Sequence, residues 1–378
     1  MKAIAEKVEN EVSLKLAFVD RKILEIGQEK VDEFLKENPK LKKYEHSLKN
    51  LFRMQEHVQS DEINTIVTAN NNHINEQLAF YNNLLRDSKY GTLEVDGKTI
   101  ELTSSNSAKY LSARDRETRK QTYFMITKMF HKQQVDFSNI LDAIFTDRIK
   151  NAELENYSSV LEKIVFEENI DPKIIETLIK AVNNNLGLMQ AYLKIKADLL
   201  DIKDPHLYDL NVPIDHNLKI KYTMEEAIEI IKKALNPLGT KYLEVVDQLI
   251  DGHIDAEPND KKHQSLTFSW NTYSFMNFRG SYLDLKNMIH EIGHIVNYYL
   301  SKEKLPFLYE DSTIFVGETA SIVNEILLNR YLCDHATTEE ERIFYLSKEI
   351  ENYMTSVFKQ TCIPNMKLIC IRRRRHRN

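Results

Sequence analysis

Residues 288–296 read Met288-Ile289-His290-Glu291-Ile292-Gly293-His294-Ile295-Val296, which contains a His-Glu-x-x-His motif. Two imidazoles four residues apart lie on one face of an α-helix, so His290 and His294 can reach the same metal ion. Glu291 lies one residue further around the helix, where a general base can take a proton from a zinc-activated water. The motif predicts a zinc hydrolase site with two histidine ligands and Glu291 as the base.

The surroundings of the motif favour a helix over a chance pentad, although a chain with 12 histidines can contain such a pentad by coincidence. Ser281 followed by Asp284 resembles an N-terminal capping arrangement. Gly293 is costly in a helix interior and suits a place where another backbone or a ligand comes close. An apolar stripe with helical spacing consists of Leu285, Met288, Ile289, Ile292, Val296 and Tyr299.

A catalytic zinc usually has three protein ligands and one open position, so a third ligand is expected from a second helix. Pro306 predicts a break after the motif helix, and residues 313–325 read as the returning helix. Glu318 on this helix is the expected third ligand, and Ser321 and Glu325 are expected to orient a ligating imidazole from behind. These three residues lie at i, i+3 and i+7, opposite Ile322, Val323, Ile326 and Leu327. A solvated polar face is the alternative interpretation of the same stripe.

His290-Glu291-x-x-His294 followed by Phe315-x-x-Glu318-x-x-Ser321-x-x-x-Glu325 resembles the M3 metallopeptidases, specifically their oligoendopeptidase F branch. The resemblance extends from near the N-terminus to about Gln360. The stretches that carry it outside the zinc motif are 114–120, 156–162, 208–213, 238–239 and the expected strand 276–278.

The resemblance implies a mainly α fold, namely a thermolysin-like zinc peptidase catalytic domain of the M3 type with small β-hairpins. It also implies one zinc ion per chain, held by His290, His294 and Glu318, and a metalloendopeptidase that cleaves short peptides admitted by a deep channel. The segment 267–276 is expected either to offer a strand edge to an extended peptide or to form a purely structural hairpin. Asn277 and Phe278, which follow it, are expected to contact substrate.

Composition and charge exclude some partners and leave others open. The chain has 378 residues with a formal net charge of -6, which predicts no general basic surface for nucleic acid. It contains no apolar run long enough to cross a membrane and no secretory leader pattern, so no membrane partner is expected. Three cysteines without a disulfide or metal pattern suit a reducing compartment, so the cytoplasm is the predicted location. The oligomeric state stays open.

The expected organisation has three parts. Residues 1–70 are predicted to form an N-terminal helical region that corresponds to part of the family's N-terminal domain. Residues 71–361 are predicted to be the catalytic domain, and 362–378 a separate tail. Within this frame, 92–102 predict a β-hairpin with an Asp96-Gly97 turn of type I′, and 70–72 (three asparagines) predict a loop.

The tail departs from the family pattern after Thr361. Family members continue with a helix resembling Met-Tyr-Thr-Glu-Tyr-Glu, where residues 362–367 of this chain read Cys-Ile-Pro-Asn-Met-Lys. The codons of the first sequence, read one nucleotide later, can encode the second, so 362–378 are expected to be out of frame. A basic tail for nucleic acid or anionic lipid is the rival interpretation of the arginines at 372–375. The resemblance further implies that the family's C-terminal histidine and tyrosine donors to the oxyanion are missing, which would impair catalysis.

Three functions therefore remain. The leading one is a zinc metalloendopeptidase in which Glu291 activates water. The second is a catalytically impaired remnant that binds zinc or peptide without turnover. The third is a helical interaction protein in which the motif is coincidental.

Overall fold

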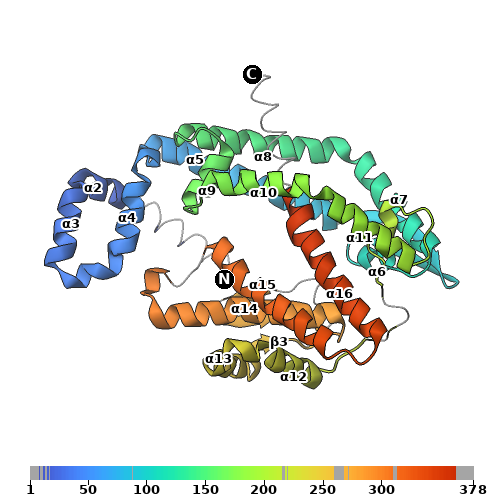
Figure 1. Cartoon of the computed structure of the whole chain (residues 1–378). Coiled ribbons are helices and arrows are strands. Elements are labelled where there is room, and N and C mark those ends of the chain that lie inside the picture. The colour runs from blue at the N-terminus through green and yellow to red at the C-terminus, as the bar shows by residue number, and fades with distance from the viewer. Residues whose placement is uncertain are drawn as a thin grey trace. The chain divides into compact units, whose positions relative to one another are not determined.

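The computed structural model describes residues 8, 12, 15–16, 18–86, 88–214, 218, 220–258, 268–270, 272–309 and 313–362, with the side chains of 268–270 left out. The fold is mainly helical with two small sheets in this part of the chain (Figure 1), as predicted. No described helix is both long enough and apolar enough to span a membrane. The predicted tail, apart from Cys362, lies outside the described residues.

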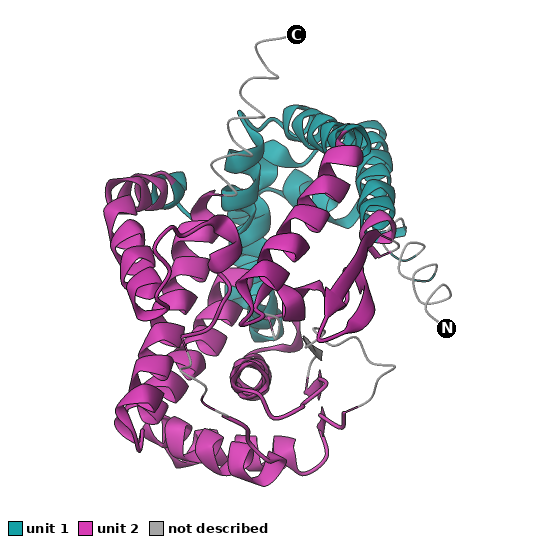
Figure 2. Cartoon of the chain, turned by 90° about the vertical axis from the view of Figure 1, so that its right-hand side faces the viewer, with its two compact units in different colours: residues 1–82, 135–175, 371–378 teal, residues 83–134, 176–370 magenta. Residues whose placement is uncertain are grey.

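The chain divides into two compact units (Figure 2), and each is continuous in space but not in sequence. The first contains the described residues within 1–82 and 135–175, and the second those within 83–134 and 176–362. The helix α5 (Asp61–Arg86) continues through residue 70, where the sequence predicted a boundary. The three-part organisation therefore stays a prediction, and the predicted loop at 70–72 is wrong because these asparagines belong to α5.

The first unit consists of helices, in which polar and aromatic contacts add to buried apolar packing. Asn151 explains why asparagines occur inside α5: its amide is paired with Asn70 and Asn71, so the polar side chains face a partner helix. His57 and Tyr157 stack with ring centroids 3.6 Å apart. The other helices of this unit are α2 (Phe18–Ile26), α3 (Gln28–Glu37), η1 (Pro39–Tyr44), α4 (Glu45–Arg53), η2 (Gln55–His57), α8 (Gln134–Leu154), α9 (Val160–Glu167) and the start of α10 (Pro172–Asn184).

The second unit begins with the predicted hairpin. Strands β1 (Lys89–Val95) and β2 (Lys98–Thr103) pair antiparallel around Asp96 and Gly97. Both turn residues have positive φ, 51° and 73°, as a type I′ turn requires, so this prediction is confirmed. The remaining helices before the metal helix, which is the one that carries His290 and His294, are α6 (Ser107–Leu111), α7 (Arg116–Lys132), the rest of α10, α11 (Leu186–Leu199), η3 (Leu207–Asp209), α12 (Met224–Leu235), η4 (Asn236–Leu238) and α13 (Thr240–Ile250).

A three-stranded sheet precedes the metal helix in the order β3-β5-β4. Strand β5 (Tyr273–Phe275) is central, parallel to β3 (Ile254–Asp255) and antiparallel to β4 (Phe268–Trp270). Strand β5 therefore ends before residues 276–278, where the sequence predicted a strand. Both edges of β5 are paired with neighbouring strands. A peptide could extend this sheet only along its outer strands.

The metal helix is α14 (Tyr282–Lys304), and it is followed by η5 (Phe307–Tyr309), α15 (Ile314–Asp334), α16 (Glu339–Tyr353) and a π-helical segment, η6 (Met354–Lys359). The side chain of Ser281 accepts from the Asp284 backbone N–H and the Asp284 side chain accepts in return, so the predicted capping box is confirmed. The apolar stripe of α14 is buried in a core built with α12, α13, α15 and α16 (Figure 1).

A buried ion cluster fastens α7 to η3 in the second unit. Asp209 is only 5% exposed and accepts hydrogen bonds from Arg119 at 2.7 Å and from Arg116 at 2.9 Å. Burial raises the pKa of the Asp209 carboxyl, but the two arginines outweigh this effect, so its pKa lies below the ordinary value. Arg119 is itself 2% exposed, and loss of its partner would leave a buried cation.

Replacing Asp209 with asparagine should lower the free energy of unfolding by about 3–5 kcal/mol at neutral pH, because one partner of a buried ion pair is removed. The folded pKa is depressed, so the carboxylate's contribution is complete above its unfolded pKa of about 3.9 and disappears as the pH falls through the folded pKa. Urea unfolding of wild type and Asp209→Asn should therefore converge at acid pH. The exposed Asp204→Asn is the control and should change little; a constant difference between wild type and Asp209→Asn from pH 7 to pH 2 would contradict the account.

Candidate metal centre

The motif histidines lie one turn apart on α14, and their imidazoles meet. The Nε2 atoms of His290 and His294 are 3.1 Å apart, although the two residues are separated by a full helical turn. Each side chain keeps about a quarter of its surface exposed, so the pair lies at the edge of the core and not inside it. One ligand molecule or ion could therefore contact both nitrogens from the solvent side.

Glu318 completes the cluster from α15. Its Oε2 lies 3.6 Å from Nε2 of His290, and its Oε1 lies 3.8 Å from Nε2 of His294. The Glu318 side chain is 46% exposed, so the cluster is open on the α15 side. Among the described residues, these three are the group whose histidine and carboxylate atoms converge closely enough to hold a metal ion.

The spacing of these atoms fits a zinc ion. Zinc bonds to nitrogen and oxygen are about 2.0–2.2 Å long, so neighbouring ligand atoms in a tetrahedral site lie about 3.3–3.5 Å apart. The two Nε2 atoms are 3.1 Å apart, and they lie 3.6 and 3.8 Å from the two oxygens of Glu318, so the separations are close to that value. Two histidines and one carboxylate are also a donor set found in catalytic zinc sites, with a fourth position left for water.

Gly293 explains how α15 comes so close to α14. A Cβ atom at this position would lie 2.6 Å from the Cα of Ser321 and 2.9 Å from its backbone nitrogen. The two backbones therefore touch at Gly293, as the sequence predicted for this glycine. Because Ser321 lies less than one turn after Glu318, this contact sets the position from which the carboxylate reaches the histidines.

The face of α15 that packs on α14 is polar, so the interpretation of the stripe as a solvated face is wrong for Ser321 and Glu325, while Glu318 stays partly exposed. Ser321 and Asn324 are fully buried, and Glu325 is 6% exposed. In contrast, Ile322 and Val323 remain 37% and 40% exposed. Buried polar groups require partners, so this packing needs specific hydrogen bonds. Asn324 shows one of them, because its Nδ2 donates to the backbone oxygen of Ile289, 3.1 Å away.

Glu325 orients the first histidine. Its Oε1 accepts a hydrogen bond from Nδ1 of His290 at 2.7 Å. An ionised carboxylate can only accept, so the hydrogen of a neutral His290 ring lies on Nδ1 and its Nε2 presents a lone pair to the cluster. Burial lowers the pKa of His290. The hydrogen bond and charge of Glu325 raise the pKa by more than burial lowers it, so the net shift is upward.

Ser321 orients Glu318. The sequence predicted instead that Ser321 would orient an imidazole. Its hydroxyl lies 3.0 Å from Oε2 of Glu318 and 3.0 Å from the Glu318 backbone oxygen. A serine three residues after a carboxylate on a helix lies on the same face, so this contact is local to α15. Both Ser321 and Glu325 thus contact one member of the cluster from behind.

Glu291 is buried next to the cluster. It is 7% exposed, and its charge acts on His290 together with the charges of Glu325 and Glu318. Its place on α14 directly after His290 gives a carboxylate beside the histidines that is not one of the three converging groups. This is the arrangement expected of a proton acceptor next to a metal site.

Two protein-family models match successive parts of the sequence. Residues 22–73 match Oligopeptidase F, and residues 109–371, which include the whole cluster, match Peptidase family M3. The chain belongs to peptidase family M3. Membership in this metallopeptidase family implies a metal cofactor, and the resemblance seen in the sequence is confirmed.

Curated relatives of this M3 chain are oligopeptidases from bacteria. Oligopeptidase PepF of Bacillus subtilis is 26% identical over 352 residues, which are 91% of this chain and 52% of the relative. The chromosomal oligoendopeptidase F of Lactococcus lactis subsp. cremoris is 26% identical over 355 residues, 91% of this chain and 58% of the relative. The chain thus spans little more than half the length of these relatives.

Solved structures show the same fold. The M3 chain superimposes on a crystal structure from Chlamydophila abortus with a TM-score of 0.83 and 24% identity, over 98% of this chain and 63% of that one. It superimposes on oligoendopeptidase-F from Enterococcus faecium with a TM-score of 0.71 and 23% identity, over 95% and 59%. The predicted M3 fold class is confirmed.

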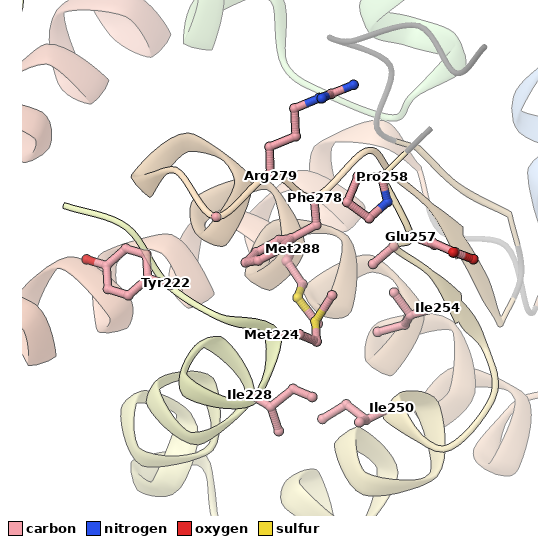
Figure 3. A pocket seen from close by; sticks show the side chains of 12 residues that line it. Tyr222, Met224, Ile228, Ile250, Ile254, Glu257, Pro258, Phe278, Arg279 and Met288 are labelled. Atoms are coloured by element: carbon pink, nitrogen blue, oxygen red, sulfur yellow. The ribbon is translucent and has the colours of Figure 1, made fainter. Parts of the chain in front are cut away.

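Asn277 and Phe278 lie between β5 and α14 and are both 5% exposed. Phe278 lines an apolar pocket of about 520 Å³ together with Met224 and Met288, whereas Arg279 points away (Figure 3). None of the three cluster residues lines this pocket. A substrate contact by Asn277 or Phe278 therefore stays a prediction, and the pocket is separate from the metal centre.

Two residues that contact the site of this M3 chain were missed by the sequence analysis. Lys286 and Asn352 both contact Glu325, at 3.1 and 2.8 Å. Lys286 carries a signal, because it lies four residues before His290 on the same helix face. Asn352 carries none, since it lies on another helix, far from the motif in sequence.

Proposed function

We propose that this chain is a zinc-dependent metalloendopeptidase that hydrolyses short peptides. The observation that carries the proposal is the convergence of two Nε2 atoms and one carboxylate from α14 and α15 at zinc-ligand spacing. The names of the bacterial relatives support oligopeptides as substrates. His290, His294 and Glu318 would hold the zinc ion, one per chain.

Zinc bound there would polarise the scissile carbonyl and make a nearby water more acidic. The proposed work of the protein then falls to Glu291. Its carboxylate accepts a proton from the attacking water as the water oxygen bonds to the carbonyl carbon. The same proton then passes to the leaving amine nitrogen as the C–N bond breaks, which leaves a free carboxyl group and a free amine.

The remaining residues keep the ligands in place. Glu325 fixes the hydrogen of His290 on Nδ1, and Ser321 holds the Glu318 carboxylate by a hydrogen bond. Because His290 and Glu318 are each oriented by a buried partner, these two ligands need little rearrangement before a metal ion binds. The absence of nucleic-acid and membrane partners and the cytoplasmic location stay predictions.

Cleavage of an internally quenched peptide tests the proposal. Turnover should disappear after dialysis against a chelator and return when one equivalent of zinc is added. Zinc binding without turnover would favour the catalytically impaired remnant. A reason for impaired catalysis would be that each relative has residues that this chain does not match. Turnover that survives removal of all metal would exclude the zinc mechanism, and a folded protein that binds no zinc would contradict the proposal. The match to peptidase family M3 argues against the helical interaction protein with a coincidental motif.

A further inference from the structure

Lys286 joins the metal helix to the carboxylate behind the site. It lies on α14 one turn before His290, and its Nζ is 3.1 Å from Oε2 of Glu325. The side chain of Glu325 is 7% exposed and that of Lys286 is 20% exposed, so water screens this pair weakly. The lysine therefore compensates the negative charge on Oε2, the Glu325 oxygen that does not face His290.

Asn352 closes a ring of hydrogen bonds around the same oxygen. Its Nδ2 donates to Oε2 of Glu325 at 2.8 Å, and its Oδ1 accepts from Nζ of Lys286 at 2.9 Å. These two bonds use opposite ends of the amide, so the contacts fix which way the amide of Asn352 faces. Helix α16 is thereby connected to the metal helix through the partner of His290.

Each oxygen of the Glu325 carboxylate consequently has at least one donor. His290 donates to Oε1, while Lys286 and Asn352 donate to Oε2. Burial raises the pKa of Glu325, but His290 and Lys286 outweigh this effect and the net shift is downward. With its outer oxygen held by two donors, the carboxylate cannot rotate away from His290 without breaking two further contacts.

We propose that Lys286 and Asn352 are positioning residues for metal binding, which hold Glu325 so that Glu325 holds the ring of His290. The inference rests on the proposed function, because it assigns these residues a role at the proposed zinc site. It adds a layer to that site, in which α16 takes part although it supplies no ligand. Neither residue is one of the three converging groups.

A neighbouring cluster offers a matched control. Lys348 lines the same cavity of about 520 Å³ as Lys286, and its side chain is equally exposed, 21% against 20%. It too pairs with a part-buried carboxylate, that of Glu351, at 2.8 Å. Glu351 also accepts hydrogen bonds from Lys196 and Tyr192 on α11, so this cluster fastens α16 to α11 and not to the metal ligands.

The experiment measures the zinc affinity of the full chain by competition with a chromophoric chelator. Lys286→Met and Asn352→Leu should each weaken zinc binding by about 10-fold, the lower end of the range for residues that support a metal ligand from behind. Lys348→Met should bind zinc like wild type. Lys286→Arg should retain most of the affinity, because it keeps a cation next to Glu325.

A double-mutant cycle separates positioning from general loosening of the fold. In a Glu325→Gln background the carboxylate is gone, so adding Lys286→Met should cause no further loss of zinc affinity. Thermal unfolding of each metal-free variant shows whether it is folded; if Lys286→Met is not, the comparison of Asn352→Leu with Lys348→Met decides. Wild-type affinity in a folded Lys286→Met or Asn352→Leu would overturn the inference, as would an equal loss in Lys348→Met. A wild-type chain that binds no zinc would instead refute the proposed function.

Discussion

Glu291→Gln should leave zinc binding intact and lower peptide turnover by about 10²–10⁴-fold, the usual contribution of a general base. Glutamine preserves the size of this buried side chain, but its amide cannot accept a proton from water. Glu291 is not one of the three converging groups, so the metal should remain. Zinc content and cleavage of a quenched peptide, measured on the same preparations, check this expectation.

Glu318→Gln provides the contrast, because it changes a converging carboxylate and should weaken zinc binding as well as turnover. Both substitutions replace glutamate with glutamine, so they preserve side-chain size equally. The charges of both glutamates act on His290. If Glu291→Gln released the zinc, Glu291 would be a ligand or a structural residue. If it left turnover unchanged, another group would be the base.

Gly293→Ala should lower the free energy of unfolding of the second unit by about 2 kcal/mol, within the range for overpacked cores. The new methyl group would lie 2.6 Å from the Cα of Ser321, and a backbone atom cannot turn aside as a side chain can. Alanine gains about 1 kcal/mol in helix propensity, which offsets only part of this cost. Separation of α14 from α15 should also move Glu318 away from the histidines, so zinc affinity should fall.

Gly187→Ala is the matched control for this prediction. Gly187 is also a helical glycine, on α11, and a Cβ atom there would meet nothing within 4 Å. This variant should be as stable as wild type or slightly more stable, with unchanged zinc affinity. Urea unfolding and chelator competition measure both quantities. A Gly293→Ala protein with wild-type stability would show that the helices can separate at no cost, contrary to the packing described.

Local patterns were predictable from the sequence because each depends on nearby residues. The spacing of His290 and His294, the cap at Ser281 and the positive-φ turn at Gly97 are decided within one or two helical turns or one hairpin. The close approach at Gly293 was predictable for a similar reason, since glycine in a helix interior indicates crowding. Glu318 was predicted as the third ligand from its place on the returning helix, and the family resemblance implied the same residue.

Features that depend on a distant partner were not predictable. The asparagines at 70–72 look like a loop until Asn151 is placed opposite them. The polar stripe of α15 looks solvated until α14 covers Ser321 and Glu325, and Ser321 contacts Glu318 on its own helix instead of an imidazole. Asn352 joins Glu325 only through tertiary packing of α16. Long-range pairing of polar groups is not visible in hydrophobic periodicity.

Zinc stoichiometry tests the central claim most directly. Metal-free protein is titrated with zinc and the bound metal is measured, for wild type and for His294→Ala, with the folded state of both verified by circular dichroism. Wild type should bind one zinc ion per chain, and His294→Ala should lose this site, because one of only three converging donors is gone. Absence of zinc binding by folded wild type, or binding of equal affinity by His294→Ala, would contradict the account.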